Sequence, residues 1–447
     1  MTTLWFEQAL LPTGWRSQVR FHIEAGRFTR IEVDAAPDAG EQRHGSVLPG
    51  MPNLHSHAFQ RLMAGMAETR SGPDGDDFWS WRDLMYRLVG AITPDDLTAI
   101  AAMAFVEMLE SGFTRSGEFH YLHHQPTGEA YDDPAEMAFA LAVAASQTDI
   151  ALTLLPVFYA HGGFGGTPPG DGQRRFLTDL DGFARLYERT LQAAATLPDA
   201  IVGIAPHSLR AVSPAELLAL TMMTKGPIHI HIAEQMKEVR DCLAWSGRRP
   251  VEWLLDHAAV DPRWCLVHAT HITDAECRAI AARGAVVGLC PVTEANLGDG
   301  IFPAASFLAA DGRFGIGTDS NVRIDLAEEL RTLEYSQRLV RQQRTVLADT
   351  IRSNGRTLFD AALEGGRCAL ADGPALEVGD AADLVELAPA VAAAGDSALD
   401  RWIFATGRVR GVWRAGVQVV AEGRHRNRDA IAARFDAVAH RLLVEQR

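Results

Sequence analysis

The feature that most constrains the fold is an alternation of short apolar runs with longer helical segments, from residue 49 to about 365. The apolar runs have the length of buried strands, and the segments between them are rich in Ala and Leu. One of these segments, 93–112, opens with a Thr cap, Pro and acids and ends at Gly, which predicts a helix. Strand–helix alternation over this length favours a parallel α/β architecture. The runs are ALTLLPVFY (151–159), AIVGIAPHS (200–208), PIHIHIAE (227–234), CLVHAT (265–270), AVVGLCP (285–291) and RFGIGTDS (313–320).

Polar residues gather at the carboxyl end of these runs. A (β/α)8 barrel builds its active site at that end of its strands. A doubly wound sheet is the competing architecture, but no G-x-G-x-x-G turn follows a strand in this chain. We therefore predict a (β/α)8 barrel.

Both flanks of this region have the pattern of strands. Residues 17–34 alternate around an Ala-Gly turn and predict a hairpin, and 373–389 and 405–425 alternate again with turn glycines. A final helix is expected over 428–446. The two flanks are predicted to pair into one small β-domain, which sets the predicted limits of the three parts at 1–48, 49–369 and 370–447.

Charge and cysteine content limit the possible partners. The net charge of −15 disfavours nucleic acid and anionic membranes, and an anionic substrate would need its own local arginines. Five scattered cysteines without a C-x-x-C pair suit a reducing cytoplasm. We see no signal peptide and no apolar run near the roughly 20 residues that span a bilayer. The chain is expected to be cytoplasmic, with no membrane partner.

Two histidines, His55 and His57, lie two residues apart after a Pro-Gly turn. Residues i and i+2 of a strand point the same way, so their imidazoles converge and form half of a metal site. With 16 histidines in the chain, a chance pair in a polar loop is an equally good interpretation of this motif alone.

Later strand ends supply the remaining groups. His231 is followed by Glu234 in HIHIAE, His268 ends the next run, and Asp319 follows glycines that allow close backbone approach. His207 and Arg210 follow another run. Each alone is most simply a hydrogen-bonded residue at a strand end, but the set in this order favours a reaction centre.

His55, His57, His231 and Asp319 supply three nitrogens and one carboxylate oxygen. That set suits one zinc ion per chain, with one position open for water, whose pKa the metal lowers towards neutrality. Glu234 is expected to carry protons between this water and the leaving nitrogen. His268 is expected to orient the hydroxide or stabilise charge, and Asp319 to accept a proton as well as bind metal.

The order H-x-H, His, H-x-x-E, His and Asp resembles the amidohydrolase superfamily, and the H-x-x-E is similar to that of its deaminases. The resemblance implies a (β/α)8 barrel with a small β-sandwich formed by both termini. Many members bridge two metals with a carbamylated lysine at the end of the fourth strand. The corresponding run here, 200–208, has no lysine, and the chain's only lysines are Lys225 and Lys237, so a mononuclear site is expected.

Within the superfamily, the chain resembles most the formimidoylglutamate deiminase family, which acts in histidine degradation. The implied reaction is hydrolysis of N-formimidoyl-L-glutamate to N-formyl-L-glutamate and ammonia, and the implied assembly is a homodimer. The resembling segments span about 49–322 and are GMPNLHSHAFQRLMAG, WSWRDLMYRL, GEFHYLHH, GIAPHSLRAV, HIHIAEQMKEV, HATHI, CPVTEANLGDG and GTDSN.

A dicarboxylate substrate needs cationic anchors, and arginine forks match carboxylates bidentately. Arg210 and Arg82 are the candidate anchors, and Tyr121 is expected to donate to a carboxylate. Gln60 and His207 are expected to hydrogen-bond the formimidoyl group.

Two other interpretations stay open. Another deaminase of the superfamily would act on a cyclic amidine such as a purine or pterin, and a barrel without metal would serve as a scaffold. The Gly- and Pro-rich segment 161–173 either borders the site or is a surface loop.

Overall fold

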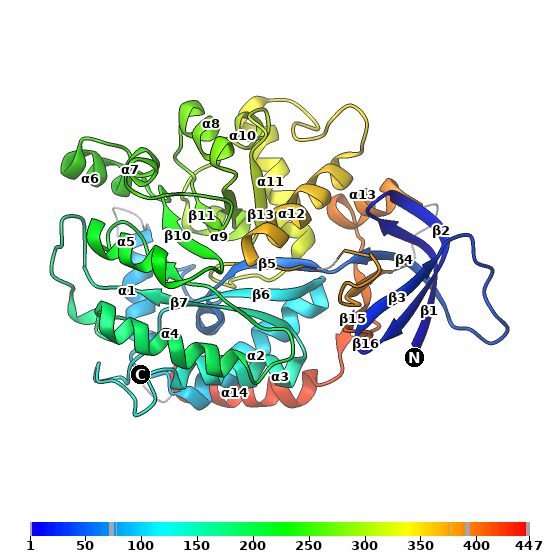
Figure 1. Cartoon of the computed structure of the whole chain (residues 1–447), viewed down its shortest axis with the longest axis horizontal. Helices are drawn as coiled ribbons and strands as arrows, with labels where there is room; N and C mark the ends of the chain where they lie inside the picture. The colour runs from blue at the N-terminus through cyan, green and yellow to red at the C-terminus, as the bar shows by residue number, and fades with distance from the viewer. Residues whose placement is uncertain (1, 71–75, 77, 374, 389–393, 444–447) are drawn as a thin grey trace.

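Parallel strands form the barrel that the sequence predicts, and helices lie around them (Figure 1). The computed structural model describes residues 2–70, 76, 78–373, 375–388 and 394–443. Parallel bridges between Ile204 and Ile228, and between Ser56 and Asp319, join the two runs of strands and close the ring. The strands are β5 (Met51–Ser56), β6 (Phe113–His120), β7 (Ala151–Phe158), β8 with β9 (Ile201–Val202, Ala205–Pro206), β10 (Ile228–Ile232), β11 (Trp264–His268), β12 (Val286–Leu289) and β13 (Arg313–Ile316).

Helices surround the barrel, and the predicted helix 93–112 is present as α2 (Pro94–Ser111). Its Thr93 side chain accepts from the amide of Asp96, and Gly112 ends the helix in a left-handed conformation with φ of 104°. The other helices are α1 (Phe78–Val89), α3 (Glu136–Thr148), α4 (Leu180–Ala194), α5 (Pro214–Met223), α6 (Met236–Ser246), α7 (Pro250–His257), α8 (Asp274–Arg283), α9 (Pro291–Leu297), α10 (Ala304–Leu308), α11 (Leu326–Arg341), α12 (Asn354–Leu370), α13 (Asp396–Phe404) and α14 (Arg428–Leu443), with the 3-10 turns η1 (Ala58–Met63) and η2 (Asp171–Gln173). None of the helices described has both the length and the apolar surface to cross a bilayer.

The two ends of the chain share one sheet, as predicted. Its order is β17-β16-β15-β14-β4-β1-β2-β3, so the C-terminal strand β14 pairs with the N-terminal strand β4. The ring centroids of Phe6 in β1 and Trp413 in β15 lie 5.7 Å apart, although β14 and β4 lie between these two strands in the sheet. The sheet therefore curls over its own core. Its strands are β1 (Thr2–Leu11), β2 (Gly14–Glu24), β3 (Arg27–Glu32), β4 (Arg43–Pro49), β14 (Leu384–Leu387), β15 (Val409–Arg414), β16 (Val417–Ala421) and β17 (Arg424–His425).

Two details differ from the sequence analysis. The hairpin over 17–34 is present as β2 and β3, but within 373–389 only Leu384–Leu387 is a strand among the described residues. Asp380 instead accepts a hydrogen bond from the amide of Ala375, which holds 375–380 as a turn. Asp383 accepts from the amide of Ala415, which follows β15. The terminal helix begins at Arg428 as expected and is described to Leu443. The predicted limits of the three parts stay predictions.

The base of the barrel, where the strands begin, is closed by the end of α12. Ala369 and Leu370 pack with Leu54, Cys265 and Val267 in one buried cluster. This apolar cluster closes the barrel interior at its base.

Charged side chains join the barrel base to the terminal sheet. Arg414 of β15 is buried between Asp383 and Asp199 and donates to both. Arg115 of β6 is buried too, and its guanidinium lies 2.6 Å from Asp372. Each of these guanidinium groups has a carboxylate partner, so the buried charges at the base are compensated.

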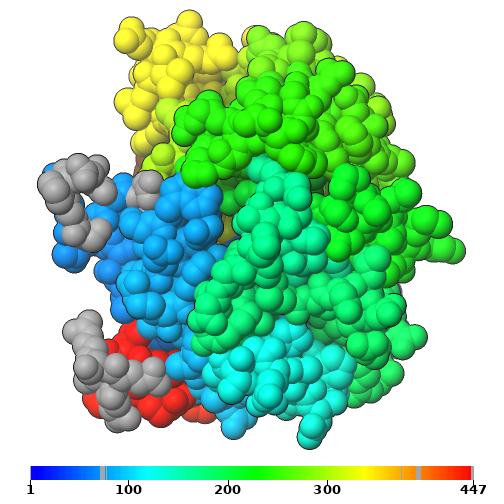
Figure 2. All heavy atoms as spheres, turned by 90° about the vertical axis from the view of Figure 1, so that its left-hand side faces the viewer, coloured from blue at the N-terminus to red at the C-terminus, as the bar shows by residue number. Residues whose placement is uncertain are grey.

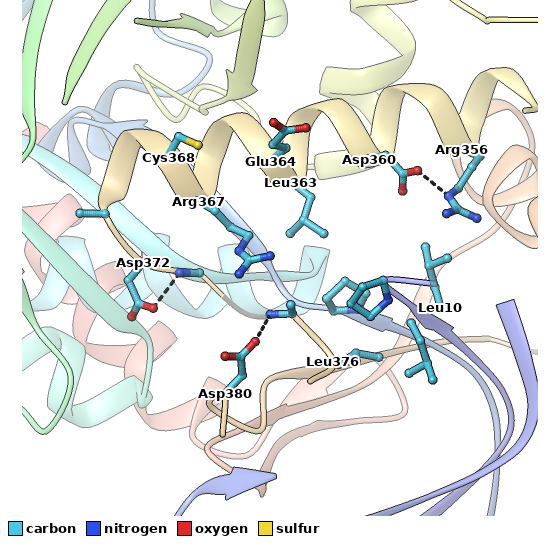
Figure 3. Close-up of a pocket in the computed structure, with 16 residues that line it drawn as sticks. Leu10, Arg356, Asp360, Leu363, Glu364, Arg367, Cys368, Asp372, Leu376 and Asp380 are labelled. Carbon is cyan, nitrogen blue, oxygen red and sulfur yellow. Dashed lines mark hydrogen bonds and ion pairs between the residues drawn. The ribbon is translucent and has the colours of Figure 1, made fainter. Parts of the chain in front are cut away.

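The groove in Figure 3 lies at the same junction, between α12 and the terminal sheet. It has a volume of about 690 Å³, and its wall combines apolar side chains such as Leu10, Leu363 and Leu376 with the ion pair of Arg356 and Asp360. None of the predicted reaction-centre residues lines it. Size alone therefore does not locate the site.

Candidate metal centre and active site

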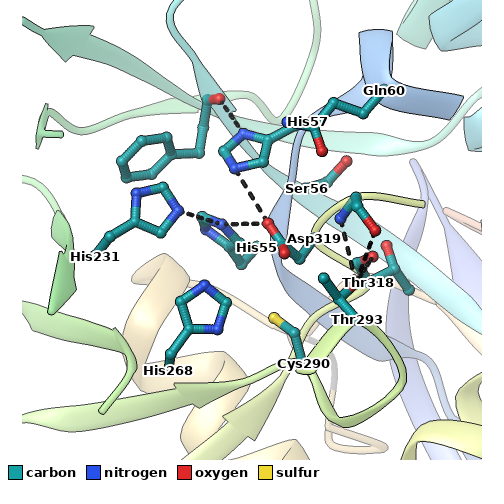
Figure 4. A network of polar contacts seen from close by, with 12 residues as sticks. His55, Ser56, His57, Gln60, His231, His268, Cys290, Thr293, Thr318 and Asp319 are labelled. Carbon is teal, nitrogen blue, oxygen red and sulfur yellow. Dashed lines mark hydrogen bonds and ion pairs between the residues drawn. The ribbon is translucent and has the colours of Figure 1, made fainter. Parts of the chain in front are cut away.

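Four predicted ligands meet at the mouth of the barrel, where the strands end (Figure 4). His55 and His57 come from the end of β5, His231 from β10, and Asp319 from the turn after β13. All four are buried, and one potential ligand atom from each lies within 4.8 Å of the others. The structure thus brings together the set that the sequence predicts, and its role as a ligand set stays a prediction.

The nitrogens of this group face one another. Nε2 of His231 lies 3.1 Å from Nε2 of His55, and the Nε2 atoms of His55 and His57 each lie 3.1 Å from Oδ1 of Asp319. These are ordinary hydrogen-bond distances. A neutral imidazole has only one N–H to donate, so a shared cation accounts for the convergence of three rings on one point better than hydrogen bonds do.

The outer ring nitrogens determine which way the lone pairs point. Nδ1 of His57 donates to the carbonyl of Phe119 at 2.8 Å, and Nδ1 of His231 donates to the carbonyl of His207 at 3.1 Å. The Nε2 atoms of both rings then point at the centre of the group. Burial lowers the pKa of His55 to about 3, so its ring is neutral. Converging lone pairs beside a carboxylate fit a metal ion.

The backbone is strained at three residues beside this group. Ala233, His268 and Asp319 have φ of 51°, 67° and 41°, in the left-handed region that non-glycine residues rarely adopt. Gly317 allows β13 to approach β5, since a Cβ there would lie 2.7 Å from the carbonyl oxygen of His55. Asn321 completes the junction by donating to the carbonyl of His57.

Glu234 and His268 form a second pair beside the four predicted metal ligands. Oε1 of Glu234 lies 3.7 Å from Nε2 of His268, and both are buried. Burial raises the pKa of Glu234 to about 7. Burial disfavours the His268 imidazolium, but Glu234 and Glu294 outweigh it and raise the pKa of His268 to about 10. A carboxyl that titrates near neutrality can both accept and donate a proton.

A cavity of about 60 Å³ opens onto these groups. Helix α1 forms one wall of the cavity through Phe78, Trp81, Arg82 and Met85. Figure 2 shows α1 in blue at the surface of the molecule, beside the green segments. The predicted residues Gln60, Tyr121, His207, Arg210, Glu234 and His268 all line this cavity. We expect the reaction here rather than in the larger groove, because His57, His231 and Asp319 of the predicted ligand set line this cavity.

The two predicted anchors lie on one side of the cavity. The guanidinium carbons of Arg82 and Arg210 lie 4.5 and 5.8 Å from the ring centroid of Trp79. The Nε of each arginine is buried and has no hydrogen-bond partner, and neither pairs with a carboxylate among the described residues. Burial opposes the charge of Arg210, but the nearby carboxylates of Glu238 and Glu234 outweigh it and raise its pKa. Two guanidinium groups with Nε atoms free for a further partner indicate a site for an anion.

Polar groups line the space around the four predicted metal ligands. Nε2 of Gln60 donates to the hydroxyl of Tyr121 at 2.8 Å, which leaves Oε1 of Gln60 without a partner among the described residues. Burial, and then the charge of Arg210, hold the pKa of His207 well below its usual range, so this ring is neutral. These are the neutral donors and acceptors that an amidine group requires.

Several site residues were missed by the sequence analysis. Tyr86, Tyr159 and Phe176 line the cavity from α1, the end of β7 and the segment after η2. Their contacts depend on tertiary packing, and no motif signals them. The open question of segment 161–173 is answered in part: Gln173 donates to the hydroxyl of Tyr159, so the end of this segment borders the site.

Comparison with family models gives two matches. Residues 46–419 match the amidohydrolase family, and residues 1–45 match the N-terminal domain described for formimidoylglutamate deiminase. The chain is 51% identical to formimidoylglutamate deiminase of Pseudomonas aeruginosa, over 99% of this chain and all of that protein.

Solved structures agree on the fold. An amidohydrolase from Brucella melitensis superposes with a TM-score of 0.97 at 51% identity, over 99% of this chain and all of the other. An adenosine deaminase from Xanthomonas campestris, solved with bound zinc, superposes with a TM-score of 0.80 at 22% identity over 98% of each chain.

Proposed function

The chain belongs to the amidohydrolase family, and we propose that it is a formimidoylglutamate deiminase. It hydrolyses N-formimidoyl-L-glutamate to N-formyl-L-glutamate and ammonia. Water adds to the formimidoyl carbon, and the bond from that carbon to the terminal nitrogen breaks. The water oxygen stays on the carbon, and its protons leave with ammonia.

One observation carries this proposal. The cavity lined by His57, His231 and Asp319 is also lined by two half-buried arginines, Arg82 and Arg210, whose Nε atoms have no hydrogen-bond partner among the described residues. A substrate with an amidine at one end and two carboxylates at the other matches both ends of this cavity. A neutral cyclic amidine would leave both guanidinium groups unpaired.

His55, His57, His231 and Asp319 would hold the metal ion. A bound divalent ion polarises water and supplies a nucleophile near neutral pH. Asp319 accepts a proton as the water attacks. Glu234 carries a proton to the leaving nitrogen, which its pKa near 7 allows. His268, 3.7 Å away, compensates the charge of Glu234 during the transfer.

The remaining residues orient the substrate. Arg82 and Arg210 each bind one carboxylate, and the hydroxyl of Tyr121 donates to a carboxylate oxygen. Gln60 and neutral His207 hydrogen-bond the formimidoyl nitrogens. Fixing both ends of a flexible chain keeps its carbon near the attacking water, which is a large part of catalysis.

We assign zinc as the metal, because three imidazoles and one carboxylate are its usual ligands. Five unpaired cysteines support a cytoplasmic location. Assembly as a homodimer is supported by exposed apolar side chains at the end of α11, where Leu339 and Val340 are 79% and 63% exposed. Sedimentation analysis tests the dimer.

An ammonia-release assay tests the function. Formimidoylglutamate is compared with guanine, cytosine and adenosine, and with the mono-amides of its two carboxylates. We expect ammonia only from formimidoylglutamate and, more slowly, from its mono-amides. Faster release from a purine or pyrimidine than from formimidoylglutamate would assign the enzyme to cyclic amidines instead.

A further inference from the structure

A second group of potential metal ligands lies beside the first and shares no residue with it. Glu234, His268 and Asp299 each offer one ligand atom, and these atoms lie within 4.8 Å of one another. All three side chains are buried, with exposed fractions of 4%, 1% and 4%. They come from different segments, after β10, at the end of β11 and after α9, so the barrel fold assembles the group.

The ring of His268 is held as a metal-binding histidine is held. Its Nδ1 lies 3.2 Å from Oε1 of Glu294, and that same oxygen accepts from the amide of Cys290 at 2.9 Å. Nε2 therefore faces Glu234 and the cavity. Metal-binding histidines usually donate their other N–H to a carboxylate, which fixes the ring and raises its basicity.

Asp299 supplies an independent indication of a missing partner. Its Oδ1 accepts from the side-chain amide of Gln235, but its Oδ2 is buried without a hydrogen-bond partner among the described residues. Its backbone carbonyl accepts from Nε2 of His271 at 2.8 Å, so the loop that bears it is fixed. A buried carboxylate oxygen without a partner is costly and indicates a ligand.

We propose that Glu234, His268 and Asp299 form a second, weaker site for a divalent cation of the zinc type, whose occupation inhibits the enzyme. One imidazole and two carboxylates suit zinc. The site is weaker than the first because it has three ligands rather than four. Occupation removes Glu234 and His268 from proton transfer, and this part of the inference rests on the proposed function.

Equilibrium dialysis tests the site without substrate. Protein loaded with one equivalent of zinc is dialysed against rising free Zn²⁺, and bound metal per chain is measured by elemental analysis. We expect a second equivalent to bind to the wild-type chain, and ammonia release to fall in parallel. Asp299→Asn should keep the first equivalent and weaken binding of the second by at least about 10-fold.

Two further variants make the result decisive. Asp274→Asn removes an exposed carboxylate at the start of α8, outside the group, and should bind both equivalents like the wild type. Glu234→Gln should weaken the second equivalent as Asp299→Asn does, which provides an answer if Asp299→Asn does not fold. The proposal is overturned if the wild-type chain never exceeds one equivalent, or if these two site variants fill like the wild type. Dialysis gives this answer even if formimidoylglutamate proves not to be the substrate.

Discussion

His229 and His231 lie two residues apart on one short strand, β10, and differ sharply in their surroundings. His229, nearer the base of the barrel, bonds through Nε2 to the carbonyl of Ala369 at 2.8 Å. His231, at the mouth, turns its Nε2 towards that of His55 at 3.1 Å. The same side chain on the same strand is therefore structural at one end and prepared for a ligand at the other.

The charged groups of the two ends show the same contrast. At the base, Arg414 donates to Asp383 and Asp199. At the mouth, Arg82 and Arg210 each bury an Nε that has no hydrogen-bond partner in the part of the chain that the structure describes. Paired charge at the base contributes to stability, and we propose that the arginines at the mouth bind substrate, as expected for the two faces of this fold. The contrast teaches that the partner of a residue, and not its type or burial, separates stability from function.

The largest expected effect comes from replacing the histidine at the mouth. His231→Ala removes one of four predicted ligands, so the protein should lose its metal, and ammonia release should fall to background. His229→Gln is the matched control on the same strand, and it should keep both metal and activity. Elemental analysis and the ammonia assay measure the two properties. A His231→Ala chain with a full equivalent of metal would remove this histidine from the ligand set.

The next effect separates chemistry from metal binding at the mouth. Glu234→Gln keeps the shape of the side chain but cannot carry a proton, so kcat should fall about 100- to 10,000-fold. Metal content should stay at the wild-type level, because Glu234 lies outside the four-residue group. If kcat stayed near wild type, another group would have to transfer the proton.

Replacing the arginine at the base should reverse the pattern. Arg414→Met leaves Asp383 and Asp199 without this partner, and breaking a buried ion pair in this way costs about 3–5 kcal/mol. Unfolding in urea should begin at lower concentration, while kcat/KM and metal content of the folded protein stay unchanged. Arg426→Met breaks an exposed pair with Asp149, where both side chains are 43% exposed, and should cost at most about 1 kcal/mol. If both variants unfolded at the same urea concentration, the buried ion pairs of Arg414 would contribute no more to stability than the exposed pair of Arg426.

These tests rest on residues that differ in how far the sequence could predict them. The ligand spacing was visible because barrel strands bring their carboxyl ends together, so H-x-H, H-x-x-E and a strand-end Asp converge whatever the helices do. Strand β6, FTRSGEFH, was not recognised as an apolar run, although all eight of its residues are buried. Its Arg115 and Glu118 are paired with Asp372 and the amide of Ala58, and pattern reasoning cannot see such distant partners.

The aromatic wall of the cavity was unpredictable for a related reason. Tyr86, Tyr159 and Phe176 lie far apart in the chain and meet through packing of α1 against the segment after η2. Asp299 and Glu294 belong to the quoted segment CPVTEANLGDG, but no spacing rule relates them to His268. Local chemistry is readable from sequence where the fold imposes a register, and it is hidden where loops set the geometry.

A smaller effect is expected from the arginines at the mouth. Removing one charge-assisted contact from Arg210 or Arg82 costs about 1.5–3 kcal/mol, or roughly 10- to 150-fold in kcat/KM. Arg210→Ala and Arg82→Ala should keep metal and fold, and Arg→Lys should restore activity only in part, because an ammonium lacks the planar fork. Arg240→Ala, exposed on α6, is the control. Arg210→Ala and Arg82→Ala should each tolerate a different mono-amide of the substrate. If both variants kept the wild-type kcat/KM, these arginines would be excluded as carboxylate anchors.

The smallest effect compares two buried glutamates. Burial raises the pKa of Glu234 at the mouth, whereas burial of Glu386 in the terminal sheet is outweighed by hydrogen bonds from His44 and the amide of Gly45, which lower its pKa below the ordinary 4.5. A carboxyl with a lowered pKa stabilises the fold above its unfolded pKa, and this contribution is lost as pH falls through its folded pKa. Glu386→Gln should therefore destabilise the protein more at pH ~7 than at pH ~4.

Urea unfolding midpoints of the wild type and Glu386→Gln at these two pH values measure this difference. The gap between the two proteins should shrink on acidification, because the wild-type carboxylate becomes protonated and resembles the amide. Activity at neutral pH should not change, since Glu386 lies in the terminal sheet, away from the cavity. A gap that widened on acidification would mean that Glu386 is destabilised by its burial as Glu234 is, and the contrast between paired and unpaired buried charge would then not extend to the terminal sheet.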